Sequence, residues 1–590
     1  MLSSRSRFEH RLLIGKRLTR LWPLLAIIAA MLAEDVSAAP LDRAAIRREL
    51  TDFSNAGMDR RLGPDYAFYH SNSPAETFPN VWVAPTRQDP IGRRYQLGGP
   101  WVLDAGLYSS TQGQILYAPD AGQFGVDRVT VLEWSNGCFS ERPEPPWWGG
   151  FRPEPESQKW RNAARGSPGM PVAMARAMGS WANCGVIIFS SGLVDMAGTC
   201  TASGTNTATW QLPAEKIVTA VAITSKSEFA LVTVCDVKTK KGQLAVLALQ
   251  GGGVSFFVHD WQDKYPCLPS FAWLSGMKLL GYIDLPGMEF PTGVAAAGND
   301  VNRYLFGPDG HVGMLVMWNP SQQTTRDSFR TGQNAGFAST AGYAVVISKH
   351  ENKAVFIDLQ PLFKRVHDLY FTTQENFEKT RNLGPGPTQW PYTFDADPGY
   401  KPVVVKVMDV PRPTAVVASL SRGAKARAYI ASEDGMVGGY RLGGLANESN
   451  AVPNEIVRVS NTQVGRNPTC LTQQKFVTDT ILAVSRGDRE IAWIKDDNMG
   501  TRVIRRLRDA RMIDPVAAEM ADTMGIEASI ITVADFRGRK ILNYRFGRVV
   551  FELQGGAIFG MGPQGLDEFE CGGTLDFPGS PFCVSATNVN

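Results

Sequence analysis

The chain has 590 residues, of which 44% are hydrophobic and 20% charged, with 60 Lys and Arg against 57 Asp and Glu. This length exceeds one ordinary compact core, so it predicts several domains or one large repeat fold. The apolar content excludes bulk disorder, and a formal charge of +3 on so large a chain excludes a strongly basic nucleic-acid binder.

The N-terminus has the order of a secretory signal peptide. Six Lys and Arg precede an apolar run from Leu21 to Ala33, and small residues end at Ala38. The run is shorter than the roughly 20 residues that cross a bilayer. We therefore expect residues 1–38 to be removed and the mature protein to be exported, periplasmic or extracellular, without a membrane span. The leader contains six bases and three acids, which leaves 54 of each in the rest, a formal charge of zero.

Residues 39–95 show no periodic pattern and are interpreted as an irregular segment. A Pro- and Trp-rich insertion follows near residues 141–182. Two prolines precede Trp147 and Trp148, and exposed indoles can stack on sugar rings, so this pair is a candidate glycan-binding surface. The alternative is that both indoles pack on the face of the fold.

The clearest repeats lie toward the C-terminus. Three segments begin with Arg412-Pro413, Asn467-Pro468 and Asp514-Pro515, and a strand segment starts 13 residues after each proline. These strand segments are rich in Val, Ile, Tyr and Thr and are bounded by Gly, Asp and Asn, a composition that favours strands over helices. A proline at the start of a strand costs no ladder hydrogen bond when it precedes the pairing.

Eight units of this kind can be counted, with centres near residues 117, 188, 232, 305, 347, 430, 482 and 532. Units of roughly 45 to 55 residues with about four strands each are typical of propeller blades. We therefore predict an all-β fold, a single β-propeller over residues 96–590 with seven blades, and eight as the alternative. A second insertion is expected near residues 364–402. β-Sandwich domains in series are the competing architecture.

The recurring X-Pro-Thr/Val-Ala motif, followed by an apolar strand, a Gly-containing turn and a second strand, resembles the exported YVTN and lactonase-type seven-bladed propellers, within the quinoprotein/lactonase-like group. The resemblance covers about residues 215 to 585, with Cys470 in place of the alanine in one copy. For lactonase and gluconolactonase types it implies a channel metal, usually calcium, or an Arg/His/Glu set that opens a lactone ring. Asp514 and Asn467 could supply two of the six to eight oxygens that calcium needs.

The eight cysteines all follow the leader, and an even number in an exported chain predicts disulfides. The candidates are Cys571 with Cys583, which enclose a short Gly- and Pro-rich segment, and Cys184 with Cys200, which are close in sequence. No CxxC pair occurs, so a zinc site is not expected.

The chain lacks G-x-S-x-G, H-E-x-x-H, Walker and EF-hand sequences, so no catalytic residue is assigned. The candidate ligand-binding residues are Arg412, Asn467 and Asp514, which occupy one repeat position immediately before the strand-start proline. Equivalent positions from different blades converge at a propeller channel, where these three would offer a cation, an amide and a carboxylate. The alternative is that they cap strand ends and bind neighbouring backbone.

We interpret the chain as an exported binding or interaction scaffold for a partner protein, a surface polymer or glycan, or a small ligand. No cofactor is assigned, and neither a nucleic-acid nor a membrane partner is expected. The alternative is a lactone or sugar-acid hydrolase with a site at the channel mouth, for which calcium is the candidate cofactor.

Overall fold

The structure is a computed structural model, and it describes residues 100–108, 113–120, 128–135, 138–141, 171–176, 184–198, 209–252, 265–266, 273–299, 305–306, 312–313, 321–380, 392–418, 427–445, 447, 451–473, 480–520, 529–538, 540–546, 549–553, 557–561, 569–576 and 580–586. The predicted leader (1–38), the irregular segment (39–95) and the Trp147/Trp148 loop lie outside these residues.

The described chain is mostly β-structure, and its strands form sheets that we number I to VII. Sheet I contains β5 (Pro171–Arg176), β6 (Cys184–Phe189), β7 (Leu193–Gly198) and β8 (Thr209–Gln211). Sheet II contains β9 (Lys216–Ile223), β10 (Phe229–Asp236), β11 (Lys241–Gly252), the short β12 (Tyr265–Pro266) and β13 (Trp273–Asp284). Sheet III contains β14 (Gly293–Gly298), β17 (Gly342–Ser348), β18 (Lys353–Asp358) and β19 (Val403–Asp409).

The next three sheets repeat the same four-stranded antiparallel order. Sheet IV contains β20 (Pro413–Ala418), β21 (Arg427–Ser432), β22 (Met436–Arg441) and β23 (Arg458–Gln463). Sheet V contains β24 (Pro468–Thr472), β25 (Thr480–Ser485), β26 (Glu490–Asp497) and β27 (Gly500–Arg508). Sheet VI contains β28 (Pro515–Met520), β29 (Ser529–Asp535), β30 (Lys540–Phe546) and β33 (Phe569–Asp576).

Sheet VII joins the two ends of the described chain. It contains β34 (Ser580–Ala586), β1 (Pro100–Tyr108), β2 (Gly113–Asp120), β3 (Arg128–Ser135) and β4 (Cys138–Glu141). β34 runs parallel to β1, with Pro100 opposite Ser580. Two separate hairpins pair β15 (Leu305–Phe306) with β16 (Val312–Gly313) and β31 (Val549–Leu553) with β32 (Ala557–Met561).

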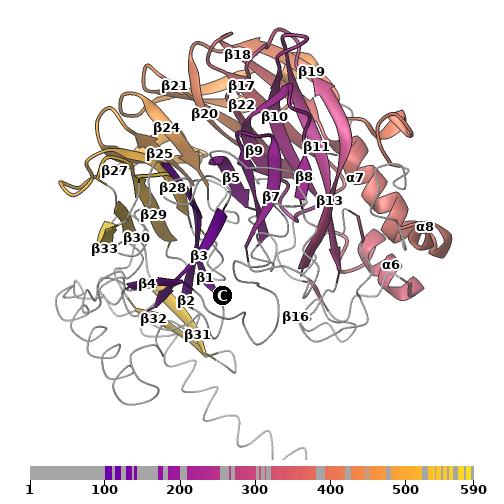
Figure 1. The fold of residues 1–590 in the computed structure, drawn as a ribbon, viewed down its shortest axis with the longest axis horizontal. Coiled ribbons are helices and arrows are strands. Elements are labelled where there is room, and N and C mark those ends of the chain that lie inside the picture. The colour runs from indigo at the N-terminus through magenta and orange to yellow at the C-terminus, as the bar shows by residue number, and fades with distance from the viewer. Residues whose placement is uncertain are drawn as a thin grey trace, which may run out of the picture. The chain divides into compact units, whose positions relative to one another are not determined.

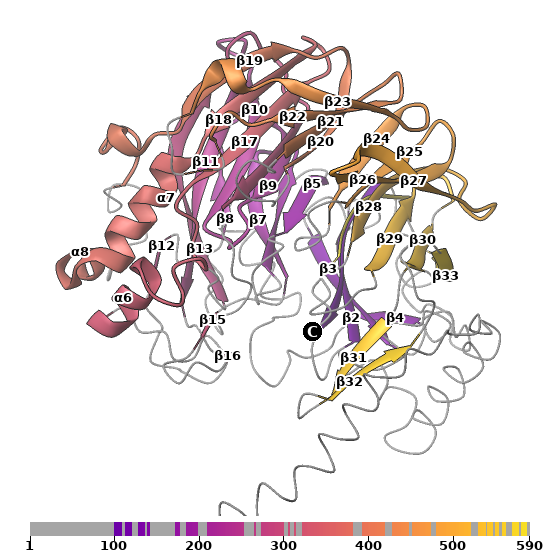
Figure 2. The same cartoon turned by 180° about the vertical axis from the view of Figure 1, so that it is seen from behind.

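The first strand of each sheet lies beside the first strand of the next. β5 contacts β9, β9 contacts β14, and this order continues through β20 and β24 to β28. β34 contacts both β28 and β5. Four-stranded antiparallel sheets that follow one another in this way are the units of propeller architectures (Figure 1, Figure 2).

The strand-start prolines of the sequence repeats mark a β-bulge. Pro413, Pro468 and Pro515 are each the first residue of their strand, and the pairing register shifts immediately after each of them. Pro171 of sheet I has the same shift and belongs to a fourth copy of the motif, which sequence comparison missed. A bulge bends its strand and increases its twist, so the prolines fix how each sheet begins.

One of the eight sequence units does not correspond to a sheet. The unit centred near residue 305 falls on the two-stranded β15–β16 hairpin, which is inserted between β14 and β17 of sheet III. The other seven units each fall on the second strand of a sheet, or on β2 in the case of the first. A short apolar hairpin has the same local periodicity as a blade, so sequence alone cannot separate them.

The core lies between neighbouring sheets. Leu482 and Trp493 of sheet V form one buried cluster with Ile531 and Tyr544 of sheet VI. Tyrosines of the second strands also cross the gap, because the Tyr343 hydroxyl donates to the Arg427 carbonyl of the next sheet at 2.8 Å.

Among the described residues, the α-helices occur only as insertions in sheet III, together with two shorter helical turns. They are α6 (Gln323–Arg330), α7 (Gln360–His367), α8 (Gln374–Glu378), the π-turn η5 (Asp368–Thr372) and the 3₁₀ turn η7 (Pro398–Tyr400), and a further 3₁₀ turn, η9 (Pro453–Glu455), lies in sheet IV. The helices lie beside β11 and β13 (Figure 1, Figure 2), and Phe329 of α6 stacks on Phe371 with ring centroids 4.8 Å apart. Within the described ranges, none of the helices has the length and apolar character to span a membrane.

Candidate functional site

The three candidate residues occupy one structural position, at the start of an inner strand beside the turn that follows the second strand. The carbonyl oxygens of Arg412, Asn467 and Asp514 accept N–H hydrogen bonds from Glu433, Arg486 and Phe536, at 3.1, 3.1 and 2.9 Å. Glu433, Arg486 and Phe536 are each the first residue after the second strand of their sheet. We call the side of the sheets that carries these strand starts and turns the start face.

Arg412 links sheets III and IV. Its side chain is 64% exposed and forms an ion pair with Glu433, whose carboxylate also lies 3.4 Å from Lys349 of the β17–β18 turn. The Arg412 backbone N–H donates to the Asn352 side-chain oxygen at 2.8 Å, and its φ of 42° is left-handed. The guanidinium is therefore held over the boundary between the two sheets.

Asn467 links sheets IV and V through its backbone. Its N–H donates to the Glu433 carbonyl at 3.2 Å, while its own carbonyl accepts from Arg486. The φ of Asn467 is 48°, a left-handed conformation that asparagine tolerates better than most residues. Sequence reasoning placed an amide ligand here, and the structure shows that the backbone of this residue contacts both neighbouring turns.

Asp514 links sheets V and VI and is the most buried of the three. Its side chain is 8% exposed, and its two carboxylate oxygens accept from the Arg486 guanidinium at 2.6 and 2.8 Å. Arg537 approaches the same carboxylate at 3.4 Å. The hydrogen bonds that the Arg486 guanidinium donates to Asp514 raise the pKa of Arg486. Charge-assisted bidentate pairs of this kind are the stronger class of protein hydrogen bond.

The three residues are thus connected, although no direct bond joins them in the described contacts. Arg412 reaches Asn467 through Glu433, and Asn467 reaches Asp514 through Arg486. Neither connecting residue, Glu433 nor Arg486, was predicted from the sequence. The signal that could have found them is their position directly after an apolar second strand, where the turn must face the next sheet.

Sheet II has a corresponding site that the proline motif did not reveal. The Glu215 carbonyl accepts the Val237 N–H at 3.0 Å, so Glu215 occupies the position of Arg412. No proline follows Glu215, because β9 starts with Lys216. The absence of proline explains why this copy was aligned only loosely.

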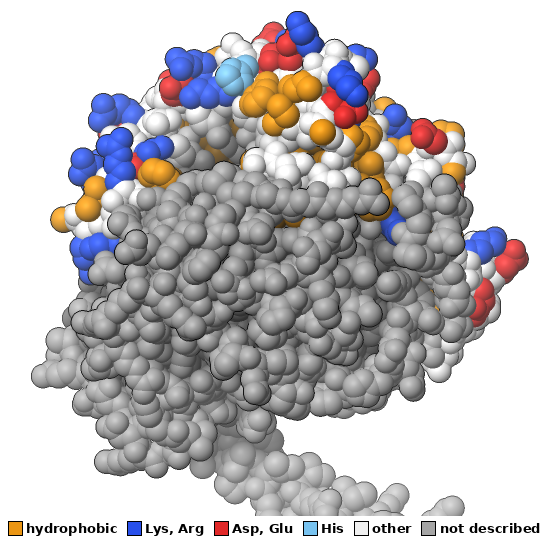
Figure 3. Space-filling view, in the orientation of Figure 1, with side chains coloured by type: hydrophobic (Ala, Val, Ile, Leu, Met, Phe, Trp, Pro, Cys, Tyr) orange, Lys and Arg blue, Asp and Glu red, His pale blue; other side chains and the backbone are white. Residues whose placement is uncertain are grey.

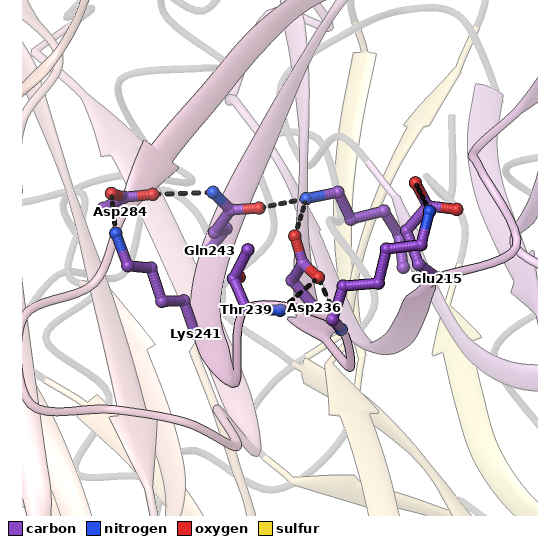
Figure 4. A network of polar contacts seen from close by, with 8 residues as sticks. Glu215, Asp236, Thr239, Lys241, Gln243 and Asp284 are labelled. Carbon is purple, nitrogen blue, oxygen red and sulfur yellow. Dashed lines mark hydrogen bonds and ion pairs between the residues drawn. The ribbon is translucent and has the colours of Figure 1, made fainter.

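Lys216 is the centre of a polar network that crosses four strands of sheet II (Figure 4). Its ammonium group lies 2.7 Å from Asp236 and 2.5 Å from the Gln243 side-chain oxygen. The Gln243 amide donates to Asp284 at 2.6 Å. The Lys216 side-chain hydrogen bond, followed by the Thr239 backbone N–H, holds the pKa of Asp236 far below its usual range.

Tyr282 completes this network as an aromatic neighbour. The Lys216 ammonium lies 4.5 Å from the centre of the Tyr282 ring, a cation–π geometry. Burial, followed by the negative charges of Glu215 and Asp236, raises the pKa of Tyr282 to about 12. The Lys216 ammonium is thus held by the Asp236 carboxylate, the Gln243 amide and the Tyr282 ring.

The candidate carboxylates are engaged by basic side chains. Asp514 is bound by Arg486, Glu433 by Arg412 and Lys349, and Asp236 by Lys216. A calcium ion at Asp514 would have to displace a guanidinium that occupies both oxygens, so the donor set does not fit this metal. Across the described part of the chain, no group of three or more His, Cys, Asp or Glu side chains is placed to hold a metal ion.

The disulfide predictions are not supported by the described residues. Cys571 lies in β33 opposite Tyr544, and Cys583 lies in β34 opposite Val102, so the two belong to different sheets. Cys184 starts β6, and Cys200 lies outside the described residues. Among the described residues, Cys235 is a free cysteine, and the Cys470 thiol donates to the Ala518 carbonyl at 3.3 Å. Burial, followed by the negative charge of Asp236, raises the pKa of the Cys235 thiol.

Comparison with known proteins identifies no family. No family model matches the chain, and no curated protein matches it. Similar solved structures include a functionally unknown protein from Desulfotomaculum acetoxidans, with 10% identity, a TM-score of 0.33 and coverage of 68% of this chain and 88% of that one. The β-propeller domain of Cps50 (Swd1) from Myceliophteria thermophila has 9% identity, a TM-score of 0.34 and the same two coverages. A periplasmic gluconolactonase of Pseudomonas aeruginosa has 11% identity, a TM-score of 0.32 and coverage of 80% of this chain and 98% of that one.

Proposed function

We propose that the chain is a single seven-bladed β-propeller that is exported and acts as a binding scaffold through its start face. Seven sheets support the blade number, with β34 contacting the first strands of both sheet VI and sheet I. The pairing of β34 with β1 supports closure, because it ties the C-terminal strand into the sheet of the N-terminal strands. The unit near residue 305 is then an insertion rather than an eighth blade.

The engagement of Asp514 by Arg486 is the observation that carries the scaffold proposal. A general base or a metal ligand needs a carboxylate oxygen that is free to meet the substrate or ion. Both oxygens of Asp514 accept from one guanidinium, and the side chain is 8% exposed. In this proposal Arg412, Asn467 and Asp514 hold neighbouring blades together and so form a rigid face on which partners dock.

The hydrolase alternative makes a different demand on the same residues. A lactone or sugar-acid hydrolase at the channel mouth would use Asp514 as a base or as a calcium ligand, and would require Arg486 to release it. Mutation would then abolish activity, whereas in a scaffold it weakens only the fold.

The test is a turnover assay on the full chain with a panel of aldonolactones, with and without calcium, together with a calcium-binding titration. We expect no turnover above background by the wild type or by Asp514→Asn, and no stoichiometric calcium binding. Lactone turnover that Asp514→Asn abolishes would establish the hydrolase instead. Stoichiometric calcium that is lost in the same variant would also overturn the scaffold proposal.

Export rests on the sequence of the leader. We propose that cleavage after Ala38 releases a chain that starts at Ala39 and is formally neutral. Mass spectrometry of the protein expressed in a bacterial host and recovered from the periplasm tests this. Recovery of the chain in the cytoplasm with its N-terminus intact would contradict it.

A further inference from the structure

The start face of sheets IV to VI carries a layer of exposed guanidinium groups, which we call the guanidinium tier. It consists of Arg412, Arg466, Arg489 and Arg537, and the side chains of Arg466 and Arg537 are each 77% exposed. In the space-filling view, basic side chains gather over β21, β24, β25 and β27 (Figure 3). All four residues stand in turns or strand starts of successive sheets.

The carboxylates that neutralise the tier lie beneath it. Glu433, Asp488 and Asp514 are 31%, 27% and 8% exposed, and each is less accessible than the exposed arginines that it meets. At Arg412, Arg466 and Arg537 a ligand therefore meets a guanidinium group before the carboxylate that pairs with it. Asp434 of the β21–β22 turn is the exposed carboxylate among the neighbouring acids.

Arg489 gives independent support, because its backbone conformation is strained. It has a φ of 52°, and it occupies the last position of the β25–β26 turn. The residue at the same turn position is Gly435 in sheet IV and Asn352 in sheet III. Glycine and asparagine are the residue types that adopt a left-handed φ most easily. A left-handed arginine costs roughly 1 kcal/mol. Its exposed side chain makes no ion pair within the described residues that would offset this cost.

Lys240 repeats the arrangement in sheet II and supplies a control. It has a φ of 53° at the last position of the β10–β11 turn, and it too is exposed without an ion pair in the described chain. Lys240 stands among the paired charges of the Lys216 network and has no tier of arginines around it. Loss of Lys240 therefore removes one cation from the start face without touching the tier.

We propose that the guanidinium tier binds a carboxylate-bearing polysaccharide, an inference that rests on the proposed scaffold function and names its ligand class. Guanidinium groups that recur in successive sheets suit a chain that presents anionic groups at intervals, and arginine pairs with carboxylates in a bidentate geometry. Arg466 already binds the Asp488 carboxylate through its Nε at 2.7 Å, so the geometry is within reach of these side chains.

The charge balance and the apolar content favour a polysaccharide over two other partners. Nucleic acids carry dense charge and are bound by strongly basic surfaces. Around the tier, however, the turns and strand starts contain six bases (Lys349, Arg412, Arg466, Arg486, Arg489 and Arg537) and six acids (Glu351, Glu433, Asp434, Asp488, Asp514 and Asp535). A protein partner normally needs an apolar or aromatic centre. Near the tier the large exposed apolar side chains are Ile513, at 46%, and Phe290, at 37%, and they come from the non-adjacent sheets VI and III rather than from one centre.

The experiment measures binding of polygalacturonate to the full chain by titration calorimetry at two salt concentrations, with neutral dextran, duplex DNA and poly-glutamate as comparison probes. The double variant Arg489→Asn/Arg537→Gln removes two guanidinium groups of the tier. Arg489 makes no ion pair within the described residues, and Arg537 makes only a 3.4 Å contact with Asp514. Asparagine is used at position 489 because it tolerates the left-handed φ of the turn. We expect the affinity of the double variant for polygalacturonate to fall about tenfold, as two exposed charge contacts of up to about 1 kcal/mol each would give. The affinity of the Lys240→Asn control for polygalacturonate should stay within about twofold of wild type, because Lys240 lies outside the tier.

Three results would overturn the proposal: no binding of polygalacturonate by the wild type, equal affinity in the double variant, or tighter binding of DNA or poly-glutamate. An unchanged urea midpoint of the double variant shows that it is folded, so a loss of affinity reports on the tier. The lactone and calcium measurements test the scaffold function separately, so a failure of polysaccharide binding can be distinguished from a failure of the scaffold proposal.

Discussion

Replacement of Asp514 by asparagine is the most direct test of how the sheets are joined. The substitution keeps the shape of the side chain but leaves Arg486 with one good acceptor where it had two, at 2.6 and 2.8 Å. Hydrogen bonds to charged groups contribute about 1.5–3 kcal/mol each, while exposed ion pairs contribute about 1 kcal/mol or less. The side chain of Asp514 is 8% exposed and that of Arg486 is 36% exposed, so this pair lies between a buried and a fully exposed ion pair. We expect the free energy of unfolding to fall by about 2 kcal/mol.

Urea denaturation of the wild type and variants, followed by circular dichroism, measures this loss. Asp434→Asn is the matched control, because Asp434 is an exposed turn residue whose carboxylate accepts the Met436 N–H at 3.1 Å. That change should cost about 0.5 kcal/mol or less. The double variant of Asp514 and Arg486 should lose less than the sum of the single losses, since both changes remove one interaction. A loss for Asp514→Asn no greater than that of the control would refute the assignment of this pair as a joint between sheets.

Three further predictions concern single side chains. Tyr429→Phe removes a hydroxyl that donates to the Asp496 carboxylate of the next sheet, so the free energy of unfolding in urea should fall by about 1–2 kcal/mol. The loss for Tyr343→Phe should be smaller, because its hydroxyl donates to a neutral carbonyl, and equal losses would contradict this. The Tyr282 pKa of about 12 exceeds the unfolded value of about 10, so its stabilising contribution is complete below about pH 10 and is lost as pH rises through 12. Ultraviolet titration of wild type minus Tyr282→Phe should place the tyrosinate signal near pH 12, and a signal near pH 10 would exclude the burial that raises this pKa. Burial raises the Cys235 thiol pKa, so near neutral pH it should react with Ellman's reagent more slowly than free cysteine; a fast phase that Cys235→Ser removes would be inconsistent with this environment.

The repeat and the strands could be predicted from the sequence because both are local properties. β-Branched and aromatic runs bounded by Gly, Asp and Asn favour strands wherever they occur. The segments predicted to start at 426 and 528 contain β21 and β29, and β25 starts one residue before the segment predicted to start at 481. The proline fixes its own φ and lacks a donor, which restricts it to the first residue of the strand.

The sequence left the blade number open between seven and eight, for a physical reason. β15 and β16 have two residues each, yet their apolar residues and turn give the same pattern as a blade. In the structure β15 and β16 pair only with each other and do not join sheet III. That outcome depends on which strand edges meet in three dimensions. Periodicity records the faces of a strand and not its partner, so the eight repeat units counted in the sequence include one hairpin that lies outside sheets I to VII.

The sequence by itself determined that Arg412, Asn467 and Asp514 share one position, because repeat spacing and strand-start prolines are written along the chain. Only the tertiary structure decided what that position does. Glu433 and Arg486, the residues that connect the three, come from turns in neighbouring repeats, and an ion pair depends on separation in space and on burial. Glu215 shares the position without any proline to mark it, and the backbone contact with Val237 is what reveals it. Residue type and spacing thus identified the candidates, while the packing of one sheet against the next set their partners.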